Sequence, residues 1–189
     1  MSKMPKSPAA HEVCPPWLCW TFDNPFRRLL QNPDRILKPY IKPGMTALDV
    51  GPGKGYFTIP MAKLVGAQGN VIAADLQQAM LDGVDRRAFK AGVQKRIKLQ
   101  LVKPDSLGIT SPVDFALTFW MVHEVPDRSK LINEIATSLK KDGLFLIAEP
   151  RIHVSRENFN DTLKIAKAVG LTVAGNPQIF LSYTALLKK

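Results

Sequence analysis

The stretch that decides the fold is Leu48-Asp49-Val50-Gly51-Pro52-Gly53-Lys54-Gly55-Tyr56, at the end of a short apolar run. Glycines at positions 51, 53 and 55 allow the backbone to turn tightly and to approach a ligand closely, because glycine lacks a Cβ. A helix that follows such a turn offers the unpaired N–H groups of its first turn to the same ligand. The pattern therefore predicts a strand, a ligand-binding glycine loop and a helix in succession.

Outward from this loop, strand and helix patterns alternate along the chain. Strands are predicted at residues 46–50, 70–74, 97–101, 113–119, 144–148, 171–173 and 178–186, and helices at 24–31, 33–41, 56–65, 77–91, 127–141 and 155–169. This alternation of strands and helices implies a parallel, doubly wound sheet, and a final hairpin adds one antiparallel strand. The expected fold class is α/β, a Rossmann-like seven-stranded sheet that binds ligands at the carboxyl ends of its strands, near residues 46–50.

Smaller signals give the boundaries of these elements. Asn32 and Ser155 are predicted N-caps of the helices that follow them. Lys140 and Lys141, followed by Gly143, are typical of a helix C-terminus. Residues 97–101 alternate apolar and polar side chains, which predicts a strand with one wet face at a sheet edge.

Several kinds of ligand compete for the glycine loop. A phosphate-binding loop fails because no Gly-Lys pair follows Gly51 at the required spacing. A dinucleotide loop needs a small residue at position 56, where Tyr56 is too large. The motif that stands here, D-x-G-x-G-x-G, places Asp49 where it would repel a pyrophosphate but favour an ammonium and a sulfonium. The remaining alternative is a tightly packed turn that Asp49 caps.

The glycine loop and the motifs after it resemble the class I S-adenosylmethionine-dependent methyltransferases, in the group that includes the quinone-biosynthesis type. The resemblance implies that Asp75 accepts hydrogen bonds from the ribose hydroxyls, with Leu76 against the adenine. It also implies that Asp105 lies near the adenine amino group, although Pro104 replaces the usual glycine of the family. The cofactor would be S-adenosylmethionine, and its predicted binding residues are Asp49, Gly51, Gly53, Gly55, Asp75, Leu76, Asp105, Ser106 and Phe119.

Catalytic candidates follow strands 113–119 and 144–148. Residues 119–125 resemble the fourth motif of the family, which makes His123 the candidate base, since an imidazole titrates near pH 6.5. Glu124 would orient or replace it; the alternative is that His123 caps the following helix or loop. Glu149 either binds a polar substrate or pins the loop before Pro150. The candidate substrate residues are Tyr56, Trp120, His153, Trp17 and Trp20.

Residues 1–43 are predicted to form an arm and short helices that cover the active site of a compact domain at 44–189. Two thiols and an imidazole in the arm, from Cys14, Cys19 and His11, could hold a soft metal or a metalloid. The spacing C-x₄-C is not that of a standard zinc knuckle. Apolar packing is the favoured interpretation of these side chains, so no metal site is predicted.

Charge and composition limit the partners. The 189-residue chain carries a net charge of +10, which favours anionic partners. No apolar run long enough to span a bilayer and no signal peptide are apparent, so a cytoplasmic location without a membrane partner is expected. A basic group between residues 86 and 103 either binds RNA or is a solvated face that protects an edge strand. The predicted function is methylation of a small-molecule acceptor; the alternatives are an RNA methyltransferase and a non-catalytic protein that binds the cofactor.

Overall fold

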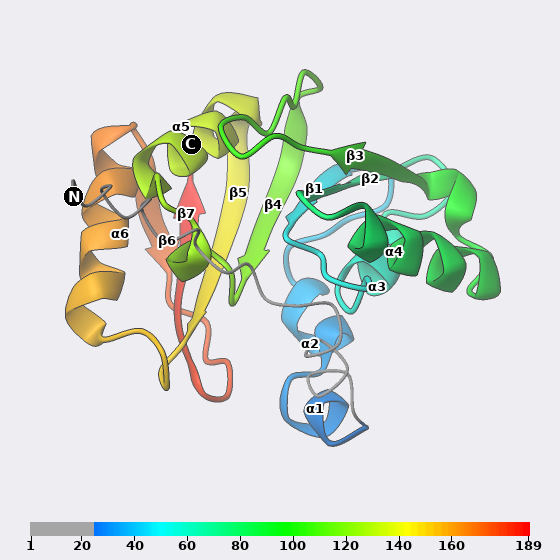
Figure 1. The fold of residues 1–189 in the computed structure, drawn as a ribbon, viewed down its shortest axis with the longest axis horizontal. Helices are drawn as coiled ribbons and strands as arrows, with labels where there is room; N and C mark the ends of the chain where they lie inside the picture. The colour runs from blue at the N-terminus through cyan, green and yellow to red at the C-terminus, as the bar shows by residue number, and fades with distance from the viewer. Residues whose placement is uncertain (1–24) are drawn as a thin grey trace, which may run out of the picture.

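The computed structural model describes residues 25–189, which form a seven-stranded sheet with helices on both faces (Figure 1). The strands are β1 (Thr46–Val50), β2 (Asn70–Asp75), β3 (Ile97–Leu101), β4 (Val113–Phe119), β5 (Leu139–Pro150), β6 (Thr172–Gly175) and β7 (Ser182–Lys188). The helices are α1 (Pro25–Leu30), α2 (Pro33–Leu37), α3 (Thr58–Leu64), α4 (Gln78–Lys90), α5 (Arg128–Ser138) and α6 (Arg156–Ala168), with 3₁₀ turns η2 (Gln94–Arg96) and η3 (Val122–Glu124). None of the helices in this part of the chain is long and apolar enough to cross a membrane.

Strand β1 lies at the point where the strand order reverses. The order is β3-β2-β1-β4-β5-β7-β6, and β1 pairs in parallel with β2 on one side and β4 on the other. Strand β7 runs antiparallel to both β5 and β6. The predicted Rossmann-like sheet is therefore confirmed, including the edge position of β3. This topology brings the loops after β1, β2 and β4 together at the carboxyl edge of the sheet.

Alternation along β4 divides the core between the two faces of the sheet. Ala116 belongs to a buried cluster with Ile135 of α5, and α6 contributes to the same cluster. Phe115 and Leu117 belong to the opposite cluster with Met61 of α3, to which α2 also contributes. All five side chains are fully buried. Cover on both faces explains why the sequence of β4 is almost wholly apolar.

The connection from β3 to β4 contains no helix, in agreement with the predicted helix ranges. Residues 102–112 form a loop in which Lys103 and Ser106 make an antiparallel bridge. Pro104, Gly108 and Pro112 divide this segment into pieces too short for a stable helix. Helices follow only β1, β2, β4 and β5.

The prediction that a helix extends to residue 141 was wrong. Helix α5 ends at Ser138, and Leu139 takes extended backbone angles and pairs with Val113 of β4. Lys140 then lies on β5, where its Nζ is 2.8 Å from the carboxylate of Asp114 on the neighbouring strand. The chain enters β5 at Leu139, where a last helical turn was predicted. The lysine pair at 140–141 therefore belongs to a strand and not to a helix end.

Other boundaries differ by a few residues. Helix α3 begins at Thr58 and not at residue 56, because the glycine loop continues through Gly55 at a φ of 89°. Helices α1 and α2 are shorter than predicted. Both predicted N-caps are confirmed, since the Asn32 and Ser155 side chains accept hydrogen bonds from amides of the following first turns.

Candidate active site

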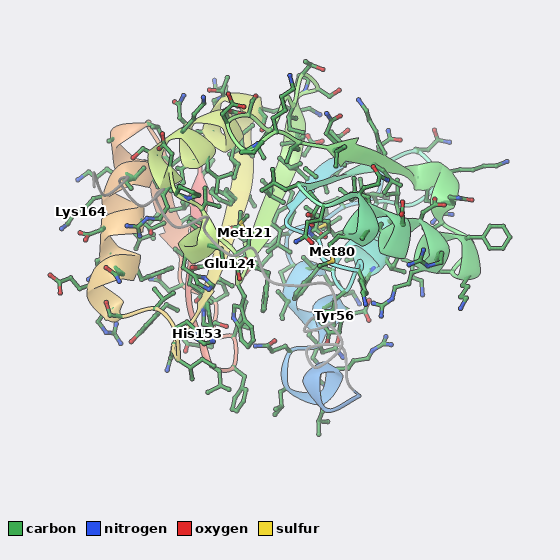
Figure 2. The ribbon with its side chains drawn as sticks, viewed as in Figure 1. Tyr56, Met80, Met121, Glu124, His153 and Lys164 are labelled. Atoms are coloured by element: carbon green, nitrogen blue, oxygen red, sulfur yellow. The ribbon has the colours of Figure 1, made fainter. Side chains whose placement is uncertain are left out.

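A cavity of about 1060 Å³ lies at the carboxyl edge of the sheet, lined by the loops after β1, β2, β3, β4 and β5. Figure 2 places Met121 and Glu124 between Met80 of α4 and His153 of the β5–α6 loop. The structure brings most of the predicted site residues to this cavity, namely Asp49, Gly51, Gly53, Tyr56, Asp75, Leu76, Asp105, Ser106, Phe119, Trp120, His123, Glu124 and His153. Gly55 and Glu149 are not among its lining residues. The volume suits a nucleoside cofactor together with a second small molecule.

The glycine loop turns the chain from β1 toward α3. Gly51 and Gly53 take positive φ angles of 69° and 53°, which side chains rarely adopt. A Cβ at Gly51 would lie 3.0 Å from the Met121 side chain, so this glycine allows the β1 and β4 loops to meet. A Cβ at Gly53 would meet nothing within 4 Å, although the residue lines the cavity. The backbone at Gly53 is therefore open to close approach by a ligand.

Asp49 is a buried carboxylate at the end of β1, 2% exposed. Its Oδ2 accepts a hydrogen bond of 2.6 Å from Oγ1 of Thr58. Burial raises the pKa of Asp49 to about 7; the Thr58 hydrogen bond opposes that shift and the charge of Asp75 adds to it. A carboxylate whose ionisation is costly in this way is stabilised by a cation bound in the cavity beside it.

Asp75 ends β2, and its Oδ1 accepts a hydrogen bond of 2.9 Å from the amide of Gln77. Burial raises the pKa of Asp75 to about 6, while hydrogen bonds from the amides of Gln77, Gly53 and Leu76 oppose the shift and the charge of Glu124 adds to it. Within residues 25–189, neither Asp49 nor Asp75 forms an ion pair. The cavity therefore presents two carboxylates without basic partners in that part of the chain.

The loop after β3 brings Asp105 and Ser106 to the cavity in an exposed turn. Glu134 of α5 anchors this turn, because its Oε2 accepts a hydrogen bond of 2.6 Å from the amide of Leu107. The same oxygen lies 3.4 Å from the Ser106 hydroxyl. This contact fixes the backbone path of the loop at Pro104, which the sequence alone did not determine. Sequence reasoning missed Glu134, since nothing in a helix pattern indicates a bond to a loop 27 residues away.

Glu149 holds the loop after β4 in place. Its Oε1 accepts hydrogen bonds of 3.1 Å from the amides of Met121 and Val122, and its Oε2 accepts one of 2.9 Å from the amide of His123. Oε2 also lies 2.8 Å from Nδ1 of His123. Glu149 is 2% exposed. Glu149 therefore holds the loop after β4 and not the loop before Pro150, which makes it a positioning residue.

His123 lines the cavity from η3 with its side chain partly exposed. Burial lowers its pKa, but the hydrogen bond and charge of Glu149 and the charge of Glu124 outweigh burial and raise the pKa above 6.5. Because a carboxylate only accepts hydrogen bonds, Nδ1 donates to Glu149 and Nε2 is the basic nitrogen of the neutral ring. The ring therefore bonds a carboxylate and not the backbone, unlike a helix cap. The ring of His153 stacks beside it, with centroids 6.1 Å apart.

Two chains of hydrogen bonds connect aromatic side chains of the cavity, Trp120 and Tyr56, to the backbone carbonyl of Phe180. Trp120 takes a positive φ of 59°, and its Nε1 donates a hydrogen bond of 2.8 Å to Oγ of Ser182. The Ser182 hydroxyl donates to the carbonyl of Phe180 at 3.3 Å, and Nε2 of Gln31 donates to the same carbonyl at 2.9 Å. Tyr56 Oη donates to the backbone carbonyl of Gln31 at 3.1 Å. Sequence reasoning missed Gln31 and Ser182, which set where these aromatic side chains lie.

The predicted arm residues fall outside the described part of the chain, so His11, Cys14, Trp17, Cys19 and Trp20 stay predictions. Among residues 25–189, no group of three or more histidine, cysteine, aspartate or glutamate side chains is arranged to hold a metal ion. The lining of the cavity includes carboxylates, imidazoles, aromatic rings and glycine backbone, together with aliphatic and basic side chains. Comparison with known proteins identifies the ligand that such a cavity binds.

Residues 41–178 match the sequence profile of a family described as Methyltransferase domain. The chain belongs to this family. It is 37% identical to a demethylmenaquinone methyltransferase of Lactobacillus johnsonii over 110 residues, which is 58% of this chain and 45% of that protein. It is 29% identical to a ubiquinone/menaquinone biosynthesis C-methyltransferase of a Marinomonas species, over 58% of this chain and 44% of that protein. The chain therefore spans less than half the length of these curated relatives.

Among solved structures, this methyltransferase domain resembles a SAM-dependent methyltransferase from Aquifex aeolicus with a TM-score of 0.81. The two are 25% identical, and the match covers 93% of this chain and 99% of the other. Family and structural likeness agree on a class I S-adenosylmethionine-dependent methyltransferase, so S-adenosylmethionine is the cofactor. The site fits that assignment, because Asp49 and Asp75 present negative charge to a ligand that carries an ammonium and a sulfonium, and Gly53 leaves room for it.

Proposed function

We propose that this methyltransferase acts on a planar, hydroxylated small-molecule acceptor of the quinol class, with His123 as the base. The observation that carries the proposal is the 2.8 Å contact between Nδ1 of His123 and Oε2 of Glu149, which leaves Nε2 to act on a ligand in the cavity. The names of two relatives, which refer to demethylmenaquinone and to ubiquinone and menaquinone biosynthesis, support the acceptor class.

The cofactor-binding roles are part of the same proposal. Asp75 holds the ribose hydroxyls, Leu76 lies against the adenine and Asp105 lies near the adenine amino group. Support comes from the position of all three residues in the lining of the cavity and from the exposure of Leu76, an apolar side chain 41% exposed just after β2. The buried carboxylate of Asp49, two residues before the first glycine of the loop, favours the positive charge of the cofactor.

The proposed reaction is a single displacement. A hydroxyl oxygen or a ring carbon of the acceptor forms a bond to the methyl carbon, and the bond from that carbon to sulfur breaks. The electron pair of the broken bond returns to sulfur, which gives S-adenosylhomocysteine. The acceptor proton goes to Nε2 of His123, and Glu149 and Glu124 stabilise the imidazolium that forms. S-adenosylmethionine supplies the reactive methyl group, so the remaining task of the chain is to align the acceptor.

Aromatic side chains form the acceptor end of the cavity in this proposal. Tyr56, Trp120 and His153 line it, and a flat apolar acceptor would stack on them. The assignment of residues 1–43 to a cover over the site stays a proposal. Within the described part, Gln31 between α1 and α2 is bonded both to Tyr56 and to the β6–β7 loop, which supports a role for this region at the acceptor end.

Turnover tests the proposal. The protein would be incubated with S-adenosylmethionine and, in separate reactions, a substituted hydroquinone, a simple phenol, a thiol and ribosomal RNA, and S-adenosylhomocysteine would be measured. We expect turnover with the hydroquinone, and we expect His123→Ala to lower kcat by about 100-fold or more without weakening cofactor binding. Methylation of RNA alone, with binding that falls steeply with salt, would instead support the nucleic-acid alternative. Cofactor binding without turnover on any acceptor would support the non-catalytic one.

A further inference from the structure

Exposed apolar side chains gather at one end of the molecule. Among the described residues, nine large apolar side chains are exposed. Five of them belong to three segments at the lower edge of Figure 1, which are α1, the β5–α6 loop and the β6–β7 loop. We call these five the docking face: Leu29 (79% exposed), Leu30 (50%), Ile152 (68%), Phe180 (49%) and Leu181 (45%).

Hydrogen bonds join the three segments of the docking face. The Gln31 side chain, next to Leu30, donates to the carbonyl of Phe180 at 2.9 Å. The amide of Arg151, next to Ile152, donates to the carbonyl of Leu181 at 2.9 Å. Leu29 and Leu30 also share a groove of about 340 Å³ with residues 177–179. The exposed side chains thus come from three neighbouring segments, one helix and two loops, and form one surface.

This surface adjoins the mouth of the active site. Ile152 belongs to the docking face and also lines the cavity beside His153. Monomeric soluble proteins rarely leave a connected group of large apolar side chains in water, and such a group usually marks a contact with a partner. A partner seated on this end would lie next to the point where an acceptor enters.

The charges around the docking face indicate the kind of partner. Arg35 lines the groove, while Arg151 and Arg156 flank the β5–α6 loop, and all three are exposed. Within residues 25–189, none of these arginines forms an ion pair; Arg28 does pair, with Asp34. A second copy of the chain, docked by two-fold symmetry, would bring these arginines toward one another, which is unfavourable. Anionic lipid headgroups would meet them with opposite charge.

We infer that the docking face seats the protein on an anionic lipid surface, with the active-site mouth turned toward the bilayer. The apolar side chains would enter the headgroup region and the arginines would contact lipid phosphates. The expectation of no membrane partner rested on the lack of a spanning segment, and contact with a surface requires none. This inference goes beyond the proposed function, and lipid binding does not depend on turnover.

Sedimentation with vesicles tests the inference on the full chain. Vesicles of phosphatidylglycerol and phosphatidylcholine are compared with vesicles of phosphatidylcholine alone, at low and at high salt. We expect binding to the anionic vesicles that weakens with salt. The double variant Leu29→Ser/Phe180→Ser is expected to weaken this binding by about tenfold or more, because two apolar side chains no longer enter the bilayer.

The matched control is Phe89→Ser, which removes an apolar side chain that is 73% exposed on α4, outside the docking face. It should leave vesicle binding unchanged, and circular dichroism and cofactor affinity should report that all variants are folded. Absence of binding to anionic vesicles, or equal loss in Phe89→Ser, would overturn the inference. A dimer in light scattering that the Leu29→Ser/Phe180→Ser variant dissociates would also overturn it, since the face would then be an interface between copies.

Discussion

Oε2 of Glu149 accepts hydrogen bonds from both the backbone amide and the ring Nδ1 of His123, at 2.9 and 2.8 Å. One carboxylate oxygen thereby fixes the position and the tautomer of the candidate base. Since Oε1 holds the two preceding amides, the loop after β4 and the imidazole are set by the same buried side chain. Stability and catalysis should therefore respond together when this carboxylate changes.

Replacement of Glu149 by glutamine is the first prediction. An amide offers one acceptor oxygen and would turn its NH₂ group toward donors, so buried hydrogen bonds are lost. We expect Glu149→Gln to lower the free energy of unfolding by about 1–3 kcal/mol, and to lower kcat by about 10-fold or more because the imidazole is no longer oriented. Urea unfolding and steady-state kinetics measure the two effects. Glu124→Gln, on the same loop, is the control. An equal loss of stability in that variant would contradict the role of Glu149 in holding the loop after β4.

The pH dependence of turnover is the second prediction. His123 must be neutral to accept a proton, and its pKa lies above 6.5 because Glu149 and Glu124 outweigh burial. We expect kcat to rise with pH through that raised pKa, and Glu149→Gln to move the rise to lower pH. The ion pair itself contributes fully to stability below about pH 6.5, and this contribution is lost as pH rises through the folded pKa. A pH–rate profile that is identical in both proteins would contradict the role of Glu149.

Much of this site could be predicted because its signals are local. The glycine loop, Asp75 at a strand end and the segment after β4 depend on short-range pattern, and topology then brings them to one cavity. Glu149 was found the same way, as a charged residue that ends a strand. Two interpretations remained for it, because sequence does not show which donors a carboxylate meets.

The residues that could not be predicted act over long distances in the chain. Gln31 bonds to a carbonyl 149 residues away, and Ser182 bonds to Trp120 62 residues away. Neither has a motif, so only the fold reveals them. The predicted end of α5 was wrong for a related reason. Residues 139–141 favour a helix end locally, but pairing of Leu139 with Val113 on β4 decides the structure.

Cofactor affinity should depend on the ionisation of the two buried carboxylates, which is the third prediction. Burial raises the pKa of Asp49 to about 7 and that of Asp75 to about 6. We expect S-adenosylmethionine to bind more tightly as pH rises from about 5 to about 8, because both groups become negative beside a cationic ligand. Calorimetry across this range measures the effect. S-adenosylhomocysteine, which lacks the sulfonium charge, should show a weaker dependence.

Replacement of Asp49 by asparagine isolates one of these carboxylates and is the fourth prediction. The folded protein holds the Asp49 proton more tightly than the unfolded chain, so its ionisation lowers the free energy of unfolding as pH rises from about 4 to about 7. Asp49→Asn removes that cost, and its amide oxygen still accepts from Thr58. We expect the ligand-free variant to be more stable than the parent above pH 7, yet to bind the cofactor about tenfold more weakly. Lower stability at that pH would contradict the assignment of a buried, costly charge.

Trp120 gives the last prediction, through Ser182. Trp120 holds a positive φ of 59°, a strained angle for a large side chain, and its indole Nε1 is tied to the Ser182 hydroxyl. In Ser182→Ala this bond is lost, so we expect the free energy of unfolding to fall by about 1 kcal/mol and the KM for the acceptor to rise severalfold. Cofactor affinity and kcat at saturation should change little, because the glycine loop and His123 are untouched. Ser155→Ala, which removes the N-cap of α6, is the matched control with about the same loss of stability. If KM rises equally in both variants, the indole does not align the acceptor, and the effect of Ser182 is only structural.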